Sequence, residues 1–256
     1  MGITVIRIDH YDEINDKQKA KLAITDEELV QMARYCLPKC ICQKLMLIQK
    51  CKKHIFVQHD TFLDKDLTPI ADMPQDIRPI NQNWSWDRIL RSPYIKQSDT
   101  LHAMFYFPDA FTEEEKRNNF NFYEPLTVHE SSLSPSVHAI LAADLQMADK
   151  AVEMYERAAR LDLDNYNNDT GDGLHITAMT GSWLAIVQGF AGMRVRNDEL
   201  NLKPFLPKNW TKYAFRLVFR GHVLEVTVDK EGADVQLISG DPLTINLLGK
   251  QVTLTR

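Results

Sequence analysis

The chain has 256 residues, of which 44% are hydrophobic and 25% charged, the balance of an ordinary globular protein with a sizeable core. Its 30 Lys and Arg residues against 35 Asp and Glu residues give a net charge of -5, so no basic excess favours nucleic acid as a partner. Charge appears at Arg7, before any apolar stretch of signal-peptide length, and no later run is long enough to span a membrane. We therefore expect a cytoplasmic protein that acts on an uncharged substrate and binds neither nucleic acid nor membrane.

The first structural signal along the chain is a short helix. Thr25 is a suitable N-cap, and the acidic first turn and apolar spacing that follow predict a helix over residues 26–35. Residues 36–53 show no regular period, and residues 58–83 are polar and rich in proline, as in a long functional loop. We expect residues 1–54 to form a divergent N-terminal segment with one helix.

All four cysteines lie in this segment, at Cys36, Cys40, Cys42 and Cys51, with His54 just beyond. Structural zinc sites usually show paired Cys-x-x-Cys knuckles, which this spacing lacks, so free thiols are favoured and no metal site is predicted. A zinc-binding interaction module over residues 36–54 stays open as an alternative. Disulfides are not expected in a cytoplasmic chain.

Residues 85–190 have the periodicity of helices joined by short turns. Helices are predicted over residues 85–91, 93–107, 112–121, 133–145 and 147–160. Residues 173–190 are apolar on nearly all sides, which predicts an inner helix that its neighbours bury. Pairs of helices with short turns favour an α/α barrel or solenoid.

The hydrophobic period changes from helical to two after residue 200. Alternation predicts strands over residues 213–219, 224–228, 235–237, 245–247 and 252–254, separated by glycine-containing turns. Such a series is typical of a small antiparallel meander or sandwich. The predicted fold class is therefore mainly α with a β appendage.

Several residues could hold an anion. Lys96, Gln97, His175, Gly181 and Ser182 offer a cation and hydrogen-bond donors, some of them near a helix start, where backbone N–H groups favour phosphate. Each also has a structural explanation. Lys96 and Gln97 would lie on a solvated helix face, and His175 would be a core histidine. Gly181 and Ser182 are not followed by the lysine of a P-loop. Spacing alone therefore indicates only a helical domain with a β appendage.

Two carboxylates, Glu124 and Glu130, lie in a serine-rich segment that leads into a helix. Glycosyl transfer requires one carboxylic acid that acts as the general acid, so both residues are candidates for this role. Capping and first-turn roles explain them equally well.

Five runs closely resemble the maltose phosphorylase branch of glycoside hydrolase family 65. They are residues 56–60, 78–84, 94–97, 123–134 and 173–194. The resemblance, which extends from Ile55 to the C-terminus, implies the C-terminal half of an (α/α)6 barrel over residues 55–199. The family's small antiparallel β-sandwich domain would then occupy residues 200–256.

The resemblance implies an inverting phosphorylase that converts maltose and inorganic phosphate to β-glucose 1-phosphate and glucose. Phosphate would be a co-substrate, no cofactor is expected, and intact family members would be homodimers. Trehalose, kojibiose and nigerose remain alternative substrates. A sugar- or phosphate-binding protein without catalysis is an alternative of another class.

The resemblance also assigns site residues by matching position. Lys96 and Gln97 would line the subsite of the transferred glucose, and Glu124 would lie beside the leaving glucose. His175 would bind phosphate, and Gly181 and Ser182 resemble the phosphate-facing turn.

Two departures bear on activity. The family's general acid is a Glu in a Gly-Pro-Asp-Glu-Tyr motif, which is absent from this sequence. Residues 33–54 do not resemble the family, so we expect an altered reading frame there. The chain is therefore expected to be a truncated phosphorylase without a catalytic residue of its own, inactive alone and prone to self-association through exposed inner-helix faces.

Overall fold

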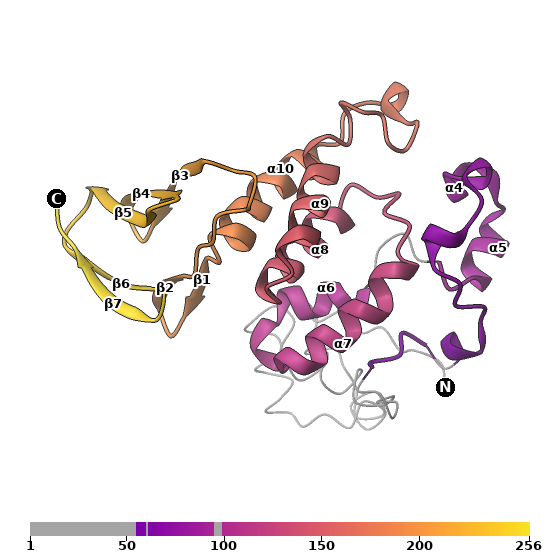
Figure 1. Cartoon of the computed structure of the whole chain (residues 1–256), viewed down its shortest axis with the longest axis horizontal. Helices are drawn as coiled ribbons and strands as arrows, with labels where there is room; N and C mark the ends of the chain where they lie inside the picture. Colours follow the sequence, from indigo (N-terminus) through magenta and orange to yellow (C-terminus); the bar gives the residue numbers. More distant parts are fainter. Residues whose placement is uncertain (1–54, 60, 95–98) are drawn as a thin grey trace, which may run out of the picture.

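The computed structural model describes residues 55–59, 61–94 and 99–256. It contains a helical part and a strand-rich part that follows it in the chain (Figure 1). The predicted helix over 26–35, the four cysteines, the divergent stretch 33–54, and Lys96 with Gln97 lie outside the described residues. Within the described ranges, no helix has the length and apolar character needed to cross a membrane.

The proline-rich region predicted as a loop forms short helical turns. Single 3-10 turns cover Phe62–Asp64, Ile70–Asp72 and Gln75–Ile77, and two short α-helices follow, α4 (Ile80–Asn83) and α5 (Trp86–Arg91). Pro69, Pro74 and Pro79 each stand directly before one of these turns, where a missing N–H costs nothing.

Four longer helices follow, and they agree with the predicted segments. They are α6 (Asp99–Tyr106), α7 (Glu113–Tyr123), α8 (Ser134–Asp144) and α9 (Ala148–Ala159). Thr112 starts α7 with a complete capping box to Glu115, which explains the sharp boundary. The predicted start at residue 93 is wrong, because Pro93 and Tyr94 are not helical.

Helix α8 is the centre of the helical part. Every residue from Ser134 to Ala143 is buried, and α6, α7, α9 and α10 (Ile176–Leu184) all pack against it. Helix α9 buries one stripe, Ala151, Met154 and Ala158, as its amphipathic sequence predicts. The side chains of Ser134, Ser136 and His138 in α8 are buried together with its apolar side chains, so polar groups lie inside the helical part of the chain.

The inner helix predicted over residues 173–190 is only partly buried. Helix α10 and the π-helical turn Ala185–Phe190 form it, and Ala178, Gly181 and Val187 face the core. The side chains of Leu174, Ile176, Met179 and Trp183 are instead 47–66% exposed. Burial requires a facing element, and among the described residues α8 and α9 cover one side only. The expected exposure of an inner-helix face is confirmed.

In the part of the chain that the structure describes, seven strands form two sheets. They are β1 (Arg194–Arg196), β2 (Glu199–Leu202), β3 (Lys212–Phe219), β4 (His222–Asp229), β5 (Gly232–Ser239), β6 (Leu243–Leu247) and β7 (Lys250–Leu254). One sheet has the order β1-β2-β6-β7 and the other β3-β4-β5, and β5 contacts β7 across them. All pairings are antiparallel except that of β2 with β6. The five strands predicted from alternation are confirmed, whereas β1 and β2 were not predicted.

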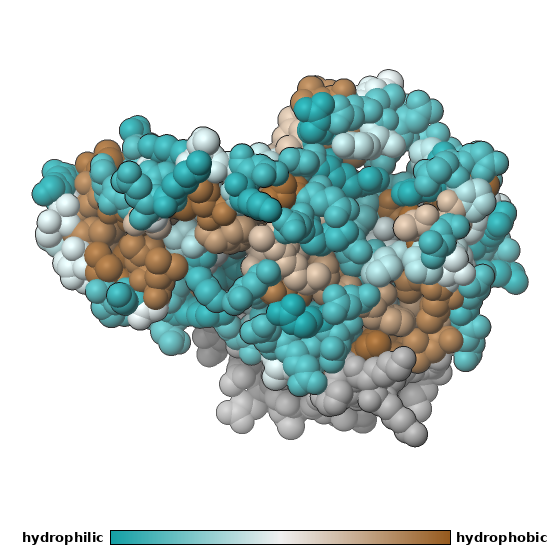
Figure 2. All heavy atoms as spheres, viewed as in Figure 1, coloured by the Kyte–Doolittle hydropathy of each residue, from teal (hydrophilic) through white to brown (hydrophobic). Residues whose placement is uncertain are grey.

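A single hydrophobic cluster joins the helices to the strands. Phe190 at the end of the π-helical turn packs edge-on against Tyr155, Phe205 and Trp210. The same cluster continues into Leu224 of β4. Figure 2 shows further apolar surface over the strands. Val218 of β3, Ile238 of β5 and Leu248 in the turn between β6 and β7 are exposed. The fold is thus mainly α with a C-terminal sheet domain, and the (α/α)6 barrel itself stays a prediction.

Candidate functional site

His175 stands at the N-cap of α10 between two aspartates. Its Nδ1 is 2.6 Å from Oδ1 of Asp162, and its backbone N–H donates to Oδ2 of the same carboxylate at 2.9 Å. Its Nε2 faces Oδ2 of Asp169 at 3.5 Å. The hydrogen bonds from His175 lower the pKa of Asp162 below its usual value. The imidazole is therefore held by an ionised carboxylate at the entry of the helix.

This geometry gives His175 a defined orientation. Asp162 accepts from Nδ1, which leaves Nε2 as the nitrogen that turns away from Asp162, toward the loop of Asp169. The side chain of His175 is 25% exposed, so a small anion could reach Nε2 if Asp169 moved aside. Neither aspartate was predicted from the sequence, because both lie in the connection after α9 and no local pattern links them to His175.

Gly181 and Ser182, predicted as a phosphate-facing turn, lie inside α10 instead. Oγ of Ser182 donates to the carbonyl of Ala178 at 2.7 Å, one turn back along the helix. A Cβ on Gly181 would lie 2.5 Å from Oγ of Ser136 in α8, so this glycine allows the two helices to approach closely. Their helical conformation agrees with the helix predicted over residues 173–190, and their contact with phosphate stays a prediction.

Glu124 lies in the turn that follows α7, and its side chain is 16% exposed. Its Oε1 is 3.2 Å from Nζ of Lys150 in α9 and 3.9 Å from Nε2 of His129. Burial acts to raise the pKa of Glu124, but His129 and Lys150 together lower it below the usual value. The carboxylate is thus ionised and points inward, and its predicted contact with the leaving glucose stays a prediction.

Two histidines lie beside Glu124. His138 of α8 is fully buried, and its ring packs edge-on against that of His129 with centroids 4.6 Å apart. Nδ1 of His129 is 3.0 Å from Oγ of Ser134. Burial lowers the pKa of both imidazoles, so both rings are neutral at pH 7.

Glu130 has a structural role. It is buried, and its two carboxylate oxygens accept the backbone N–H groups of Ile80 at 2.7 Å and Asn81 at 3.1 Å. These bonds fasten the start of α4 to the segment that enters α8. The sequence-based interpretation of Glu130 as a cap of the helix that follows it is therefore wrong, because the N–H groups that it accepts belong to α4, fifty residues earlier in the chain.

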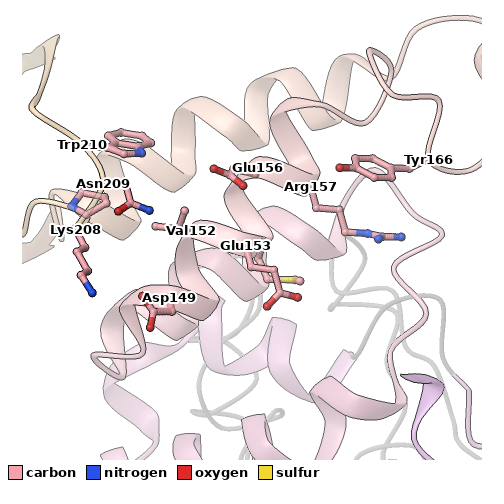
Figure 3. A pocket seen from close by; sticks show the side chains of 11 residues that line it. Asp149, Val152, Glu153, Glu156, Arg157, Tyr166, Lys208, Asn209 and Trp210 are labelled. Carbon is pink, nitrogen blue, oxygen red and sulfur yellow. The ribbon is translucent and has the colours of Figure 1, made fainter. Parts of the chain in front are cut away.

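A groove of about 420 Å³ lies between α9 and residues 207–210 (Figure 3). Its wall carries Glu153, Glu156 and Arg157 from the helix, with Lys208 and Trp210 opposite. None of the predicted site residues that the structure describes lines this groove. The structure therefore separates the groove from His175, Gly181 and Ser182 on α10.

The comparisons with known proteins agree with this architecture. Residues 4–184 match the glycosyl hydrolase family 65 central catalytic domain, and residues 193–254 match the C-terminal domain of the same family. The first match includes the divergent stretch 33–54, for which an altered reading frame stays a prediction.

Individual relatives are phosphorylases by name. Maltose phosphorylase of Bacillus subtilis (strain 168) is 60% identical over 200 residues, which is 78% of this chain and 26% of that protein. Alpha,alpha-trehalose phosphorylase of Geobacillus stearothermophilus is 39% identical over 93% of this chain and 30% of that protein. A solved structure described as a putative kojibiose phosphorylase from human microbiome superposes with a TM-score of 0.77 at 38% identity, covering 93% of this chain and 32% of that one.

The chain spans about a quarter to a third of the length of these relatives. Its two family matches cover the helical part and the strands in the order in which the structure places them. The chain therefore belongs to glycosyl hydrolase family 65.

Proposed function

We propose that this chain is the C-terminal part of an inverting glycoside phosphorylase that converts maltose and inorganic phosphate to β-glucose 1-phosphate and glucose. The observation that carries the choice of maltose is the 60% identity to a maltose phosphorylase, against 39% and 38% for the trehalose and kojibiose relatives. The complete protein would be a cytoplasmic homodimer with no cofactor. Trehalose, kojibiose and nigerose are the competing substrates.

The contribution of this chain would be to bind phosphate and one glucose unit. His175, at the N-cap of α10, would turn Nε2 from Asp169 to a phosphate oxygen while Asp162 keeps hold of Nδ1. A helix N-terminus adds a favourable dipole for the anion. Ser182 lies two turns further along the same helix, and Lys96 with Gln97 would contact the glucose. Gly181 would contribute by setting the approach of α10 to α8.

Catalysis would depend on a group that this sequence does not contain. In an inverting phosphorolysis, phosphate is the nucleophile and a single carboxylic acid protonates the leaving oxygen. The Gly-Pro-Asp-Glu-Tyr motif is absent, and Glu130 is engaged by two backbone N–H groups. Loss of a general acid costs a factor of about a hundred to ten thousand in rate. The chain alone would therefore bind phosphate without turnover.

Phosphate binding and turnover can be measured on the same sample. Calorimetric titration with inorganic phosphate should show saturable binding that His175→Ala abolishes and His222→Ala, on β4, leaves unchanged. Incubation with maltose and phosphate should yield no glucose 1-phosphate. Turnover would refute the proposed inactivity, and phosphate binding that survives His175→Ala would refute the proposed site.

A binding protein without catalysis is a second candidate. It is favoured by the same observation, an oriented His175 in a chain that lacks the general-acid motif. Joining this chain to the missing part of a family 65 phosphorylase separates the two candidates. Restored phosphorolysis of maltose, with trehalose as the comparison substrate, would support the enzyme, and an inactive protein that still binds phosphate would support the binding role.

A further inference from the structure

The two carboxylates beside His175 come from one connection, residues 160–175, which joins α9 to α10. Asp162 lies just after the end of α9, whereas Asp169 lies farther along, at the N-cap of the 3-10 turn Thr170–Asp172. The first has an oxygen 2.6 Å from Nδ1 of the ring, and the second has an oxygen 3.5 Å from Nε2. The two contacts differ in length and in how firmly each aspartate is held, which indicates different roles.

Asp162 is firmly held. Its carboxylate accepts from the ring of His175 at Nδ1 and also from the backbone N–H of the same residue, at 2.9 Å. The preceding Leu161 is 2% exposed, and its carbonyl accepts the backbone N–H of Tyr166 at 3.2 Å. A carboxylate only accepts hydrogen bonds, so Nδ1 carries a proton. Asp162 therefore fixes both the orientation of the ring and the nitrogen that faces outward.

Asp169 is held less firmly. Its 3.5 Å contact with Nε2 is longer than the about 2.7–3.2 Å of an ordinary N–H···O hydrogen bond. The loop around it is open, because a Cβ at Gly171 or Gly173 would meet no atom within 4 Å. Oδ1 of Asn165 accepts the backbone N–H of Asp169 at 3.1 Å. A rotation about χ1 of Asp169 can thus carry its carboxylate away while Asn165 keeps the loop in place.

We propose that Asp162 is the positioning residue of His175 and that Asp169 is an internal competitor for phosphate, whose carboxylate occupies Nε2 until the anion displaces it. The inference rests on the proposed phosphate site and adds to it a regulation by the chain itself. A carboxylate oxygen and a phosphate oxygen are both anionic acceptors, so they require the same N–H donor. Their charges repel each other, so the two do not share Nε2.

The two aspartates should affect phosphate affinity in opposite directions. Competition reduces the apparent affinity by the fraction of molecules in which Nε2 is free. Asp169→Asn keeps the size of the side chain and removes its charge, so phosphate should bind about three- to tenfold more tightly. Asp162→Asn offers one acceptor oxygen to two N–H groups and releases the ring, so phosphate should bind about tenfold more weakly. A general effect of net charge would strengthen binding in both variants.

The first experiment requires no phosphate. The full chain is labelled with ¹⁵N at histidine, and comparison with His175→Gln identifies the ring resonances by NMR. We expect Nδ1 of His175 to have the shift of a protonated nitrogen in the wild type and in Asp169→Asn, whereas Asp162→Asn should average the two tautomers. Asp169→Asn should also move the Nε2 resonance. An unprotonated Nδ1 in the wild type, or an Nε2 resonance that Asp169→Asn leaves in place, would overturn the proposal.

The second experiment measures phosphate affinity by calorimetric titration with inorganic phosphate. Asp172→Asn is the matched control, because it removes the same charge from the same loop and Asp172 has no ion pair with His175 in the described residues. We expect this control to change the affinity by about twofold or less. An equal gain in Asp172→Asn and Asp169→Asn, or a gain in Asp162→Asn that is folded by circular dichroism, would overturn the proposal.

The outcomes separate this proposal from the proposed phosphate site. If His175→Ala abolishes phosphate binding and Asp169→Asn leaves the affinity unchanged, the site stands and the competitor role is refuted. If neither the wild type nor Asp169→Asn binds phosphate, both proposals are refuted. If only Asp169→Asn binds phosphate and a further His175→Ala change removes that binding, the competitor role is supported in its strongest form.

Discussion

Replacing Gly181 with alanine tests how closely α10 approaches α8. The new Cβ would lie 2.5 Å from Oγ and 2.7 Å from Cβ of Ser136. Ser136 is buried, and its hydroxyl donates to the carbonyl of Leu133 at 3.1 Å, so it has little freedom to move away. The helices must separate, or the first turn of α8 must shift.

The size of the effect is the difference between two opposing contributions. Alanine is about 1 kcal/mol better than glycine inside a helix. Overpacking a buried contact costs about 1–3 kcal/mol. We therefore expect Gly181→Ala to lower the free energy of unfolding by about 1 kcal/mol, which corresponds to a fall in Tm of about 2–4 °C in a chain of this size.

Urea denaturation and thermal melting measure this change. Gly171→Ala is the matched control, since no atom lies within 4 Å of a Cβ at that glycine, and its stability should not fall. Ser136→Gly removes the clashing atoms, so adding Gly181→Ala to a Ser136→Gly protein should not lower the stability any further. A Gly181→Ala protein at least as stable as the wild type would refute the close-packing argument.

Three further predictions concern other contacts. Glu130→Ala should lower the free energy of unfolding by about 2–3 kcal/mol, because one buried and one partly buried backbone N–H group lose a charged acceptor. Glu130→Gln should lose less, and equal urea midpoints for Glu130→Ala and the wild type would contradict the capping role. His175 lowers the pKa of Asp162 below its ordinary 3.8, so the stability from this contact is present above pH 3.8 and disappears as pH falls through the lowered pKa. The difference in unfolding free energy between wild type and Asp162→Asn should therefore shrink below pH 3.8. A difference that does not change with pH would refute the contribution of this contact. Trp183→Gln on the exposed face of α10 should reduce self-association in sedimentation velocity, whereas a wild-type chain that is already a monodisperse monomer would contradict the role of that face.

Local sequence determined most of the secondary structure. The capping box of Thr112 and Glu115 and the apolar stripe of α9 depend on residues three and four positions apart, so the sequence alone locates α7 and α9. Strands β3 to β7 follow from alternation in the same way. Strands β1 and β2 escaped prediction, and no local pattern shows the parallel pairing of β2 with β6, which lies more than forty residues later.

Only the tertiary structure decided what the individual polar residues do. Glu124 and Glu130 share one segment, yet Lys150 of α9 draws the first into the interior and the N–H groups of Ile80 and Asn81 engage the second. The resemblance assigns Gly181 to a phosphate-facing turn, which stays a prediction, whereas only the folded chain shows that Gly181 packs against Ser136 of α8. Periodicity and capping act over a few residues and can be read along the chain, whereas the charge and burial of a side chain depend on partners that only the folded chain brings near.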